Sequence, residues 1–315
     1  MNRKGQKIFV AGHRGMVGSA IVRRLEAGGY TDIVTRSREE LDLLDQQAVR
    51  RFMAEERPDY VFLAAARVGG IHANNVERAD FLYENLVIET NLLHAAHMAD
   101  VQHLLFLGSS CIYPRNCAQP IREEYLLTGP LEPTNEPYAI AKIAGLKLCE
   151  AFNAQYGRNY VAVMPTNLYG PNDNYDLHSS HVLPALLRKA HEGRVRGEGE
   201  LVVWGSGTPR REFLYVDDLA DACVFLMEAG YKGPLLNIGT GEDLTIRELA
   251  ELVVDIVGFE GRIVFDPAKP DGTPRKLLDV SKLSALGWKA NTSLREGIAE
   301  TYRQAPFHQQ SDGRP

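Results

Sequence analysis

The chain has 315 residues, of which 44% are apolar and 24% are charged, and its formal net charge at pH 7 is −6. A chain of this length buries enough apolar surface to fold as one large domain or two modest ones, and its composition excludes collagen-like, low-complexity and disordered proteins. The acidic balance argues against a broad nucleic-acid-binding surface, and no run approaches the 18 apolar residues typical of a membrane-spanning helix.

The first half of the chain alternates short apolar runs with longer amphipathic segments. We predict strands at residues 7–11, 32–35, 59–65, 103–107 and 160–164. Between them we predict helices at residues 18–27, 46–56, 79–99 and 137–156. Strands that alternate with helices indicate a doubly wound parallel sheet, and strands that are apolar throughout fit burial on both faces. The predicted fold class is therefore α/β.

The pattern becomes less regular after residue 171. We expect a polar stretch at residues 172–181, a helix at 183–191 and a loop at 192–200. A strand-like run at 211–216, a helix at 217–229 and a further strand at 234–239 follow. From residue 245 we expect a helix, then a short strand at residues 262–265 and a loop at 267–276. We expect residues 305–315 to form a frayed tail.

A glycine motif occupies residues 12–18 (GHRGMVG), between the first predicted strand and the first predicted helix. Glycines at this spacing allow a tight turn, close approach of a pyrophosphate and close packing of helix on strand, while the helix N-terminus favours phosphate charge. The motif therefore favours a dinucleotide-binding Rossmann fold, with an ordinary strand–helix turn as the alternative.

The end of the second predicted strand carries Arg36 and Arg38 in place of an acidic residue. A carboxylate at this point would bind the ribose 2′-hydroxyl of NAD, whereas arginines accommodate the 2′-phosphate of NADP(H). Arg14 in the glycine motif could join them. These residues favour NADP(H), and the alternative is a solvated basic loop.

Tyr138 and Lys142 are four residues apart in a predicted helix, so they share one face. A nearby ammonium group favours the phenolate, which would bring the tyrosine pKa, about 10 in water, closer to neutral pH. Such a group suits a proton donor to a reduced carbonyl. Ser109 and Ser110 follow the fourth predicted strand, upstream of this pair.

The cysteines lack CxxC spacing and nearby paired histidines, which favours reduced thiols in a cytoplasmic protein without structural zinc. They are Cys111, Cys117, Cys149 and Cys223. Cys111 lies two residues after Ser109, and in an extended loop both side chains would project the same way. We expect the other three cysteines to serve packing.

Together, the glycine motif, the serines and the tyrosine–lysine pair resemble the extended short-chain dehydrogenase/reductase family of nucleotide-sugar enzymes. The resemblance runs from residue 7 to about residue 302, with further support at residues 91–96 (NLLHAA), 167–171 (NLYGP) and 211–218 (REFLYVDD). Within the family, the chain is most similar to enzymes that convert GDP-4-keto-6-deoxy-mannose to GDP-L-fucose by 3,5-epimerisation and NADPH-dependent 4-keto reduction. The residues that carry this likeness are 12–18, 108–114 (GSSCIYP), 132–142 (EPTNEPYAIAK) and 269–279 (KPDGTPRKLLD).

The resemblance implies a dinucleotide-binding domain at residues 1–170 plus about 212–240, and a smaller interleaved substrate-binding domain at about 171–211 plus 241–315. The positions it implies for NADP(H) are Gly12, His13, Arg14, Gly15, Met16, Val17, Gly18, Arg38, Leu43, Leu107, Gly108, Ser109, Ser110, Lys142, Pro165, Thr166, Asn167, Leu168 and His181. The positions it implies for the GDP-sugar are Lys189, Trp204, Arg211, Asp271 and Lys276, with Lys189 at the diphosphate.

The carbonyl of a 4-keto sugar acidifies the protons at C3 and C5, so epimerisation needs one group to remove a proton and another to return it on the opposite face. The resemblance makes Cys111 the expected base and His181 its acid partner, while a packed thiol and a surface histidine are the alternatives. For the reduction, Tyr138 is the expected proton donor, assisted by Lys142 and Ser109.

Two other functions stay open. A single-step epimerase or reductase of another nucleotide sugar, such as a UDP-sugar 4-epimerase, would keep NAD tightly bound. A non-catalytic dinucleotide sensor is less consistent with retention of Ser109, Tyr138 and Lys142. Dehydratases of the family carry an Asp-Glu pair where this chain has Cys111 and Ile112, so dehydration is disfavoured.

The expected partners are the GDP-sugar and a second copy of the chain, with no nucleic acid, membrane or metal ion. In this family the helices predicted at residues 79–99 and 137–156 pack against their symmetry mates as a four-helix bundle. Their apolar residues exceed one narrow stripe, as expected for helices covered on two sides, although burial by the sheet alone is the alternative. These residues are Phe81, Leu82, Leu86, Leu93, Ile140, Leu146 and Leu148.

Overall fold

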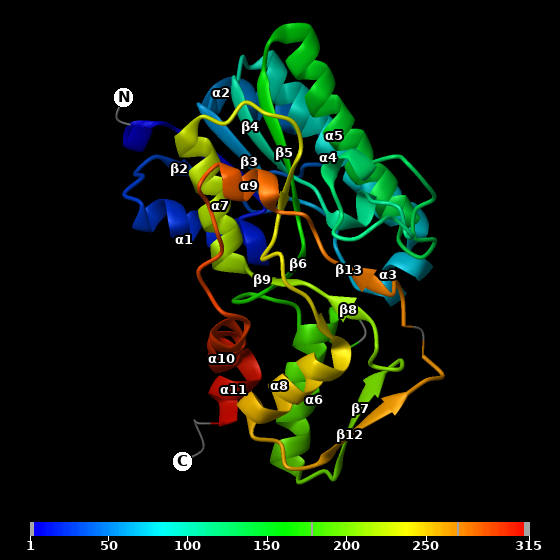
Figure 1. Ribbon diagram of the computed structural model, residues 1–315. Helices are drawn as coiled ribbons and strands as arrows, with labels where there is room; N and C mark the ends of the chain where they lie inside the picture. Colours follow the sequence, from blue (N-terminus) through cyan, green and yellow to red (C-terminus); the bar gives the residue numbers. More distant parts are fainter. Residues whose placement is uncertain (1–2, 178, 270, 312–315) are drawn as a thin grey trace.

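Six parallel strands form the central sheet of the chain in the computed structural model, which describes residues 3–177, 179–269 and 271–311 (Figure 1). The strands are β1 (Ile8–Ala11), β2 (Ile33–Val34), β3 (Tyr60–Leu63), β4 (His103–Leu107), β5 (Asn159–Pro165) and β10 (Leu236–Ile238). Their order across the sheet is β10-β5-β4-β3-β1-β2, and every neighbouring pair is parallel. From β1 the strand order runs one way across the sheet to β2 and the other way through β3, β4 and β5 to β10. The order therefore changes direction between β1 and β3, and doubly wound sheets bind ligands at such a point.

Helices cover both faces of this sheet. One face carries α2 (Gln46–Glu56), α4 (Arg78–Met98) and α5 (Glu136–Tyr156), and the other carries α1 (Met16–Ala27), α7 (Val216–Ala229) and α9 (Ser281–Ala285). Neighbouring residues of β1 serve the two layers, since Phe9 packs with the first group and Ile8 with the second. The predicted α/β fold class with a doubly wound parallel sheet is confirmed.

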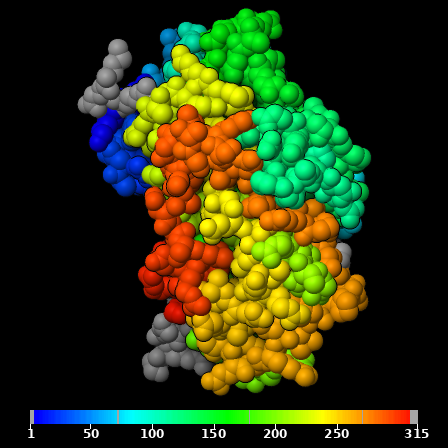
Figure 2. All heavy atoms as spheres, viewed as in Figure 1, coloured from blue at the N-terminus to red at the C-terminus, as the bar shows by residue number. Residues whose placement is uncertain are grey.

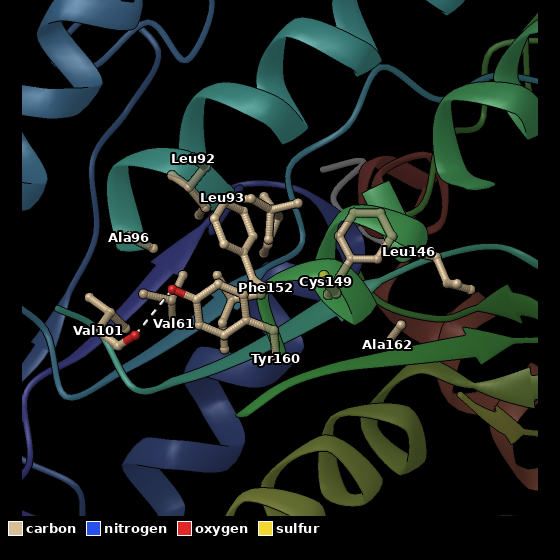
Figure 3. Close-up of a cluster of buried hydrophobic side chains, with 14 of the residues drawn as sticks. Val61, Leu92, Leu93, Ala96, Val101, Leu146, Cys149, Phe152, Tyr160 and Ala162 are labelled. Atoms are coloured by element: carbon tan, nitrogen blue, oxygen red, sulfur yellow. Dashed lines mark hydrogen bonds between the residues drawn. The ribbon is translucent and has the colours of Figure 1, made fainter. Parts of the chain in front are cut away.

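The core beneath α4 and α5 is continuous apolar packing (Figure 3). Leu92 of α4 and Leu146 and Cys149 of α5 form one cluster with Tyr160 of β5. The hydroxyl of Tyr160 donates to the backbone carbonyl oxygen of Val101 at 3.1 Å, so this buried phenol is satisfied. The two helices are therefore fixed on the sheet by large apolar side chains.

All four cysteines are free. Cys149 and Cys223 are buried in the cores on opposite faces of the sheet, and Cys117 packs at the edge of the core beneath α4 and α5. These positions fit the packing role expected for the three. Cys111 is also buried, at the end of β4.

A second group of elements lies below the sheet in Figure 1 and has its own apolar core. It contains α6 (Val182–Arg196), α8 (Ile246–Val257), α10 (Leu294–Gln304), α11 (Pro306–Ser311), β7 (Glu200–Trp204) and β12 (Arg262–Asp266). The shorter elements are α3 (Ile71–Val76), β6 (Asn167–Tyr169), β8 (Arg210–Arg211), β9 (Phe213–Tyr215), β11 (Leu244–Thr245), β13 (Arg275–Lys276) and the 3₁₀ turns η1 (Arg3–Gly5), η2 (Ser110–Ile112) and η3 (Glu123–Tyr125). The predicted domain boundaries stay a prediction, and α9 packs with the sheet although it comes late in the chain.

The predicted loop at residues 192–200 is wrong, because α6 continues through its first half and β7 begins at its end. Gly193 does not end the helix. A Cβ there would lie 2.8 Å from the ring of Phe259, so this glycine makes room for packing. The helix ends instead at Gly197, which has a φ of 66° in the left-handed region that favours glycine.

The predicted frayed tail at residues 305–315 is also wrong in part. The chain forms α11 there, beginning at Pro306, because the first turn of a helix tolerates proline. Residues 312–315 lie outside the described residues. The predicted loop at residues 267–276 likewise ends in the short strand β13. In the described part of the chain, no helix combines the length and the apolar character needed to cross a membrane.

Glu212 joins the sheet to the C-terminal segment. Its buried carboxylate accepts hydrogen bonds from the backbone amides of Thr240 at 2.6 Å, Gly241 at 2.8 Å and Leu278 at 2.9 Å. The first two amides follow β10, and the third follows β13. Burial raises the pKa of Glu212, and these amides oppose the rise because they stabilise the ionised form. One carboxylate thus fixes β13 beside the sheet.

The C-terminal segment also contacts the loop after β4, and Figure 2 shows orange residues of this segment against cyan-green residues of the upper part. The amide of Ile121 donates to the carbonyl oxygen of Leu277 at 2.7 Å, and the amide of Asp279 donates to the carbonyl oxygen of Ile121 at 2.8 Å. Lys282 pairs with Glu123 at 3.0 Å. The segment is therefore held on both sides.

Gly18 lies where α1 crosses the end of β1, and a Cβ there would overlap the carbonyl oxygen of Gly12. We expect Gly18→Ala to lower the free energy of unfolding by about 1–3 kcal/mol, because a tight backbone contact cannot absorb an added methyl group. The control is Gly199→Ala, where a Cβ would meet no heavy atom within 4 Å. Urea unfolding measures both variants, and equal stability would contradict this close approach of α1 and β1.

Candidate active site

A cavity of about 1150 Å³ lies along the carboxyl edge of the sheet and extends to α6, β7 and β13. The turns after β1, β4 and β5 form one part of its wall, together with α5. These turns sit at the crevice where a doubly wound sheet binds its ligand. The remaining wall comes from the second group of elements, so the cavity lies between the two cores.

The glycine motif makes a tight turn between β1 and α1. Gly12 has a φ of 85°, and a Cβ there would lie 2.9 Å from the backbone of Ala65. The amide of Gly15 donates to the carbonyl oxygen of Gly12 at 3.0 Å. Gly15 then caps α1 without a side-chain hydrogen bond, and the first turn of α1 contains no acidic residue. The N-terminus of α1 is therefore open to an anion at the cavity wall.

The three arginines predicted to bind a 2′-phosphate are not equivalent. Arg38 is exposed and borders the cavity. Arg36 also borders it, but its guanidinium pairs with Glu56 at 2.7 Å. Arg14 does not border the cavity and lies 3.4 Å from Glu39. Arg38 is the arginine best placed for such a phosphate, and the contribution expected of the exposed Arg14 stays a prediction.

Most of the positions predicted to bind the cofactor border the cavity. They are Gly12, Gly15, Met16, Val17, Arg38, Leu43, Leu107, Gly108, Ser109, Ser110, Lys142, Pro165, Thr166, Asn167, Leu168 and His181. His13, Arg14 and Gly18 do not border it. Gly18 acts through the shape of the turn instead, since it packs against Gly12.

The loop after β4 is not extended, in contrast to the expectation that would align Ser109 with Cys111. It folds into the 3₁₀ turn η2, and the hydroxyl oxygen of Ser109 accepts a hydrogen bond from the amide of Cys111 at 3.4 Å. Capping of this turn is a local alternative to extended backbone that serine offers. Both residues still border the cavity, brought together by the turn.

Tyr138 and Lys142 border the cavity from the same face of α5, with the Lys142 ammonium 5.8 Å from the centre of the Tyr138 ring. The prediction that Lys142 lowers the pKa of the phenol is wrong here. Burial raises the pKa of Tyr138 well above its usual value, with smaller contributions from Cys111 and Glu89. The lysine charge is shared with Glu89, whose Oε1 lies 2.9 Å from Nζ. Tyr138 is thus a neutral phenol, able to donate a proton.

Cys111 and His181 also border the cavity. Burial raises the pKa of the Cys111 thiol, while the charge of Lys276 acts in the opposite direction. His181 stands at the N-cap position of α6 and is exposed at the cavity wall, where its protein surroundings and then the charge of Lys276 lower the pKa of its imidazole. The resting forms at neutral pH are therefore a thiol and a neutral imidazole.

A cationic end of the cavity is formed by Lys189, Arg211 and Lys276. Arg211 and Lys276 are direct partners in the pairing of β8 with β13. Burial lowers the pKa of Lys276, and the charge of Arg211 adds to this. Lys189 donates to the carbonyl oxygen of Val202 at 3.2 Å and lies 5.4 Å from the centre of the Trp204 ring. Cations grouped in this way suit a diphosphate.

Asp271 borders the same end of the cavity, but its carboxylate is engaged within the protein. It accepts hydrogen bonds from the amide of Ser206 at 2.7 Å and from the hydroxyl of Ser206 at 2.9 Å. Arg211 also donates to its backbone carbonyl oxygen at 3.4 Å. Asp271 therefore fixes the turn after β7, and its contact with a sugar nucleotide stays a prediction.

Sequence reasoning missed Glu89, the buried partner of Lys142. A glutamate inside a predicted helix is usually solvated, so only the packing of α4 on α5 identifies this one. Arg115, Glu132 and Asn135 were missed as well, and all three border the cavity from the segment between η2 and α5. Within the described ranges, no group of three or more His, Cys, Asp or Glu side chains could hold a metal ion.

Comparisons with known proteins agree along nearly the whole chain. The model of the NAD dependent epimerase/dehydratase family matches residues 8–239. The chain is 59% identical to GDP-L-fucose synthase of Escherichia coli (strain K12), over 95% of this chain and 96% of that protein. It is 60% identical to GDP-L-fucose synthase 1 of Arabidopsis thaliana, over 96% of this chain and 94% of that protein. A solved GDP-mannoheptose C4 reductase from Campylobacter jejuni with NADP bound is 41% identical, with a TM-score of 0.88 over 96% of this chain and 98% of that chain.

Proposed function

The chain belongs to the NAD dependent epimerase/dehydratase family, and we infer that it converts GDP-4-dehydro-6-deoxy-D-mannose to GDP-L-fucose. It is an NADP-dependent enzyme that carries out 3,5-epimerisation and then reduction of the 4-keto group. The observation that carries this conclusion is its likeness, over about 95% of its length, to two GDP-L-fucose synthases.

The residues at the carboxyl edge of the sheet fit NADP(H). The open N-terminus of α1 suits the pyrophosphate, and the exposed Arg38 suits the 2′-phosphate. Close packing of Gly12 and Gly18 leaves the turn free of side chains at this point. When bound, the cofactor supplies the hydride for reduction at C4.

We propose that Tyr138 donates a proton to the C4 oxygen as hydride reaches C4, so that the ketone becomes an alcohol. Its raised pKa keeps the phenol protonated at neutral pH, which the reductive direction requires. Ser109 orients the carbonyl through its hydroxyl, and Lys142 provides positive charge beside the phenol. The structure of the pocket thus favours proton donation over proton removal at Tyr138.

For the epimerisation, we propose that Cys111 removes the protons at C3 and C5 and that His181 returns them from the opposite face. The thiol must first lose its proton, and the charge of Lys276 favours that loss. The neutral imidazole can accept this proton and deliver it to the sugar. One thiol and one imidazole then supply the base and the acid, and each epimerisation returns both groups to their neutral forms, ready to exchange protons with solvent.

The GDP-sugar is proposed to place its diphosphate at the cationic end, on Lys189, Arg211 and Lys276. Trp204 offers an exposed ring at the same end, and Asp271 holds the turn after β7 in place. The sugar would then bridge the two predicted domains. The free thiols fit a reducing compartment, and we propose the cytoplasm.

We also propose a homodimer through a four-helix bundle of α4 and α5. Several apolar residues expected to support it are buried within one protomer, among them Phe81, Leu93 and Leu146. The support comes instead from exposed side chains on the two helices, since Tyr83 is 67% exposed and Ile140 is 43% exposed. Large exposed apolar side chains on two adjacent helices suit burial by a second copy.

Incubation with GDP-4-dehydro-6-deoxy-D-mannose and NADPH should yield GDP-L-fucose, identified from its stereochemistry by NMR.

In deuterated water, Tyr138→Phe should abolish NADPH oxidation but still exchange the C3 and C5 protons, because only the reduction needs the phenol. Cys111→Ser should suppress that exchange, and a His181 variant should resemble it. Exchange of both protons by Cys111→Ser at the wild-type rate would show that Cys111 is not the base.

Arg38→Ala should raise the KM for NADPH about tenfold or more and leave the KM for NADH unchanged, since a hydrogen bond to a charged group contributes about 1.5–3 kcal/mol. The control is Arg50→Ala, which removes an exposed arginine of α2 that does not border the cavity. Steady-state kinetics with both cofactors distinguish the two cases. An equal loss with NADH would assign Arg38 a structural role.

Tyr83→Glu should shift the mass in sedimentation at micromolar concentration from dimer to monomer, because a charge would be buried without a partner. Leu286→Glu is the matched control, as Leu286 is exposed but lies at the end of α9, away from α4 and α5. A wild-type chain that sediments as a monomer would contradict the dimer.

A further inference from the structure

A buried carboxylate forms an ion pair with the lysine of the proposed active site. Glu89 of α4 is 1% exposed, and its Oε1 lies 2.9 Å from Nζ of Lys142, which is 2% exposed. Apart from this ion pair, neither oxygen of Glu89 has a hydrogen-bond partner in the part of the chain that the structure describes. Removal of one partner from a buried ion pair strongly destabilises a protein, because the other charge is left buried and unpaired. The carboxylate and the ammonium therefore depend on each other.

Helix α5 leaves room for this carboxylate. A Cβ on Gly145 would lie 2.6 Å from Oε2 of Glu89 and 2.6 Å from the ring of Phe106. Glycine weakens the interior of a helix, so a glycine here needs a reason in packing. The clearance that it gives to Glu89 and Phe106 supplies that reason, independently of the ion pair.

A backbone carbonyl and an aromatic ring hold the Lys142 ammonium in addition to Glu89. Nζ donates to the carbonyl oxygen of Leu107 at 3.0 Å and lies 4.8 Å from the centre of the Phe106 ring. An ammonium group has three N–H donors, and the carbonyl oxygen of Leu107 takes one of them, while Glu89 supplies the opposite charge. Lys142 also borders the cavity.

We propose that Glu89 is a positioning residue for the reduction: its carboxylate is the counter-ion that holds the Lys142 ammonium at the cavity beside Tyr138. This role rests on the proposed function. The other ionisable groups that sense the pair are Tyr138 and Cys149 on α5 and Cys111 in the turn η2. Burial raises the pKa of Glu89, and the Lys142 charge opposes that rise.

Glu89→Gln keeps the shape of the side chain and removes its charge. A buried ammonium without a counter-ion is favoured to lose its proton, and Tyr138 loses a negative neighbour that helps to keep it protonated. Both effects lower the pH at which the protonated forms needed for reduction are lost. The alkaline limb of kcat/KM for NADPH oxidation should therefore shift about one pH unit lower, which is about a tenfold loss on that limb. Exchange of the C3 and C5 protons should change less than this, since burial, Lys276 and Ser109 all influence the Cys111 thiol more than Lys142 does.

Glu89→Asp retains a carboxylate and should move the alkaline limb back toward wild type. Glu150→Gln is the matched control, because it removes an exposed ion pair with Lys147, 2.8 Å long, from the same helix as Lys142. Its pH profile should equal that of wild type.

An unchanged pH profile in Glu89→Gln would overturn the proposal. A loss of both reactions in equal proportion would also overturn it, because that result indicates a structural role. If wild type oxidises no NADPH with this substrate, the proposed function fails and the role of Glu89 fails with it.

Unfolding measurements test the pair without any activity. Glu89→Gln and Lys142→Met each leave one buried group without its partner, so each should lower the midpoint of thermal unfolding. The double variant removes both groups and should be more stable than either single variant, because no charge is left unpaired. Additive losses in the double variant would contradict the mutual dependence of the two charges.

Discussion

The buried carboxylate of Glu212 sets the distance between the two sides of the cavity. Its side chain holds the amide of Leu278, two residues after Lys276, while its backbone carbonyl accepts a hydrogen bond from the side chain of Asn167 at 2.8 Å. Asn167 borders the cavity on the side of the sheet, and Lys276 borders it at the cationic end. The residue before Glu212, Arg211, belongs to that same end. A carboxylate with no exposed surface therefore ties together groups that the sequence separates by more than 100 positions.

The sequence was most informative where chemistry depends on local spacing. The alternation of apolar runs with amphipathic segments predicted the parallel sheet, and the spacing of Tyr138 and Lys142 predicted their shared helix face. It was least informative where one hydrogen bond or one packing contact decides between two local structures. After β4, a serine cap between residues two apart favours a 3₁₀ turn over an extended loop. In α6, Gly193 makes room for Phe259, a contact distant along the chain, where the sequence predicted a loop.

Burial outweighs the nearby charges in setting the protonation of the proposed catalytic groups. Loss of hydration can move a pKa by up to about 3–5 units, whereas one neighbouring charge moves it by about 1–3 units. This order explains why Tyr138 and Cys111 have raised pKa values although Lys142 and Lys276 are close to them. A prediction from sequence counts the charges but cannot count the water removed around them. The neutral forms that result are the ones from which a reductase and an epimerase can both begin.

The pairing of β8 with β13 places Arg211 and Lys276 side by side, and main-chain hydrogen bonds prevent the two strands from moving apart to relieve the repulsion. The backbone thus holds two cationic side chains close together in the free enzyme. A bound polyanion would neutralise both, so nucleotide binding is expected to stabilise the strand pairing as well as to fill the cavity. Small multivalent anions such as sulfate would satisfy the same two cations, and ionic strength would weaken their attraction for any occupant. The choice of buffer salt becomes a variable in every measurement of affinity on this protein.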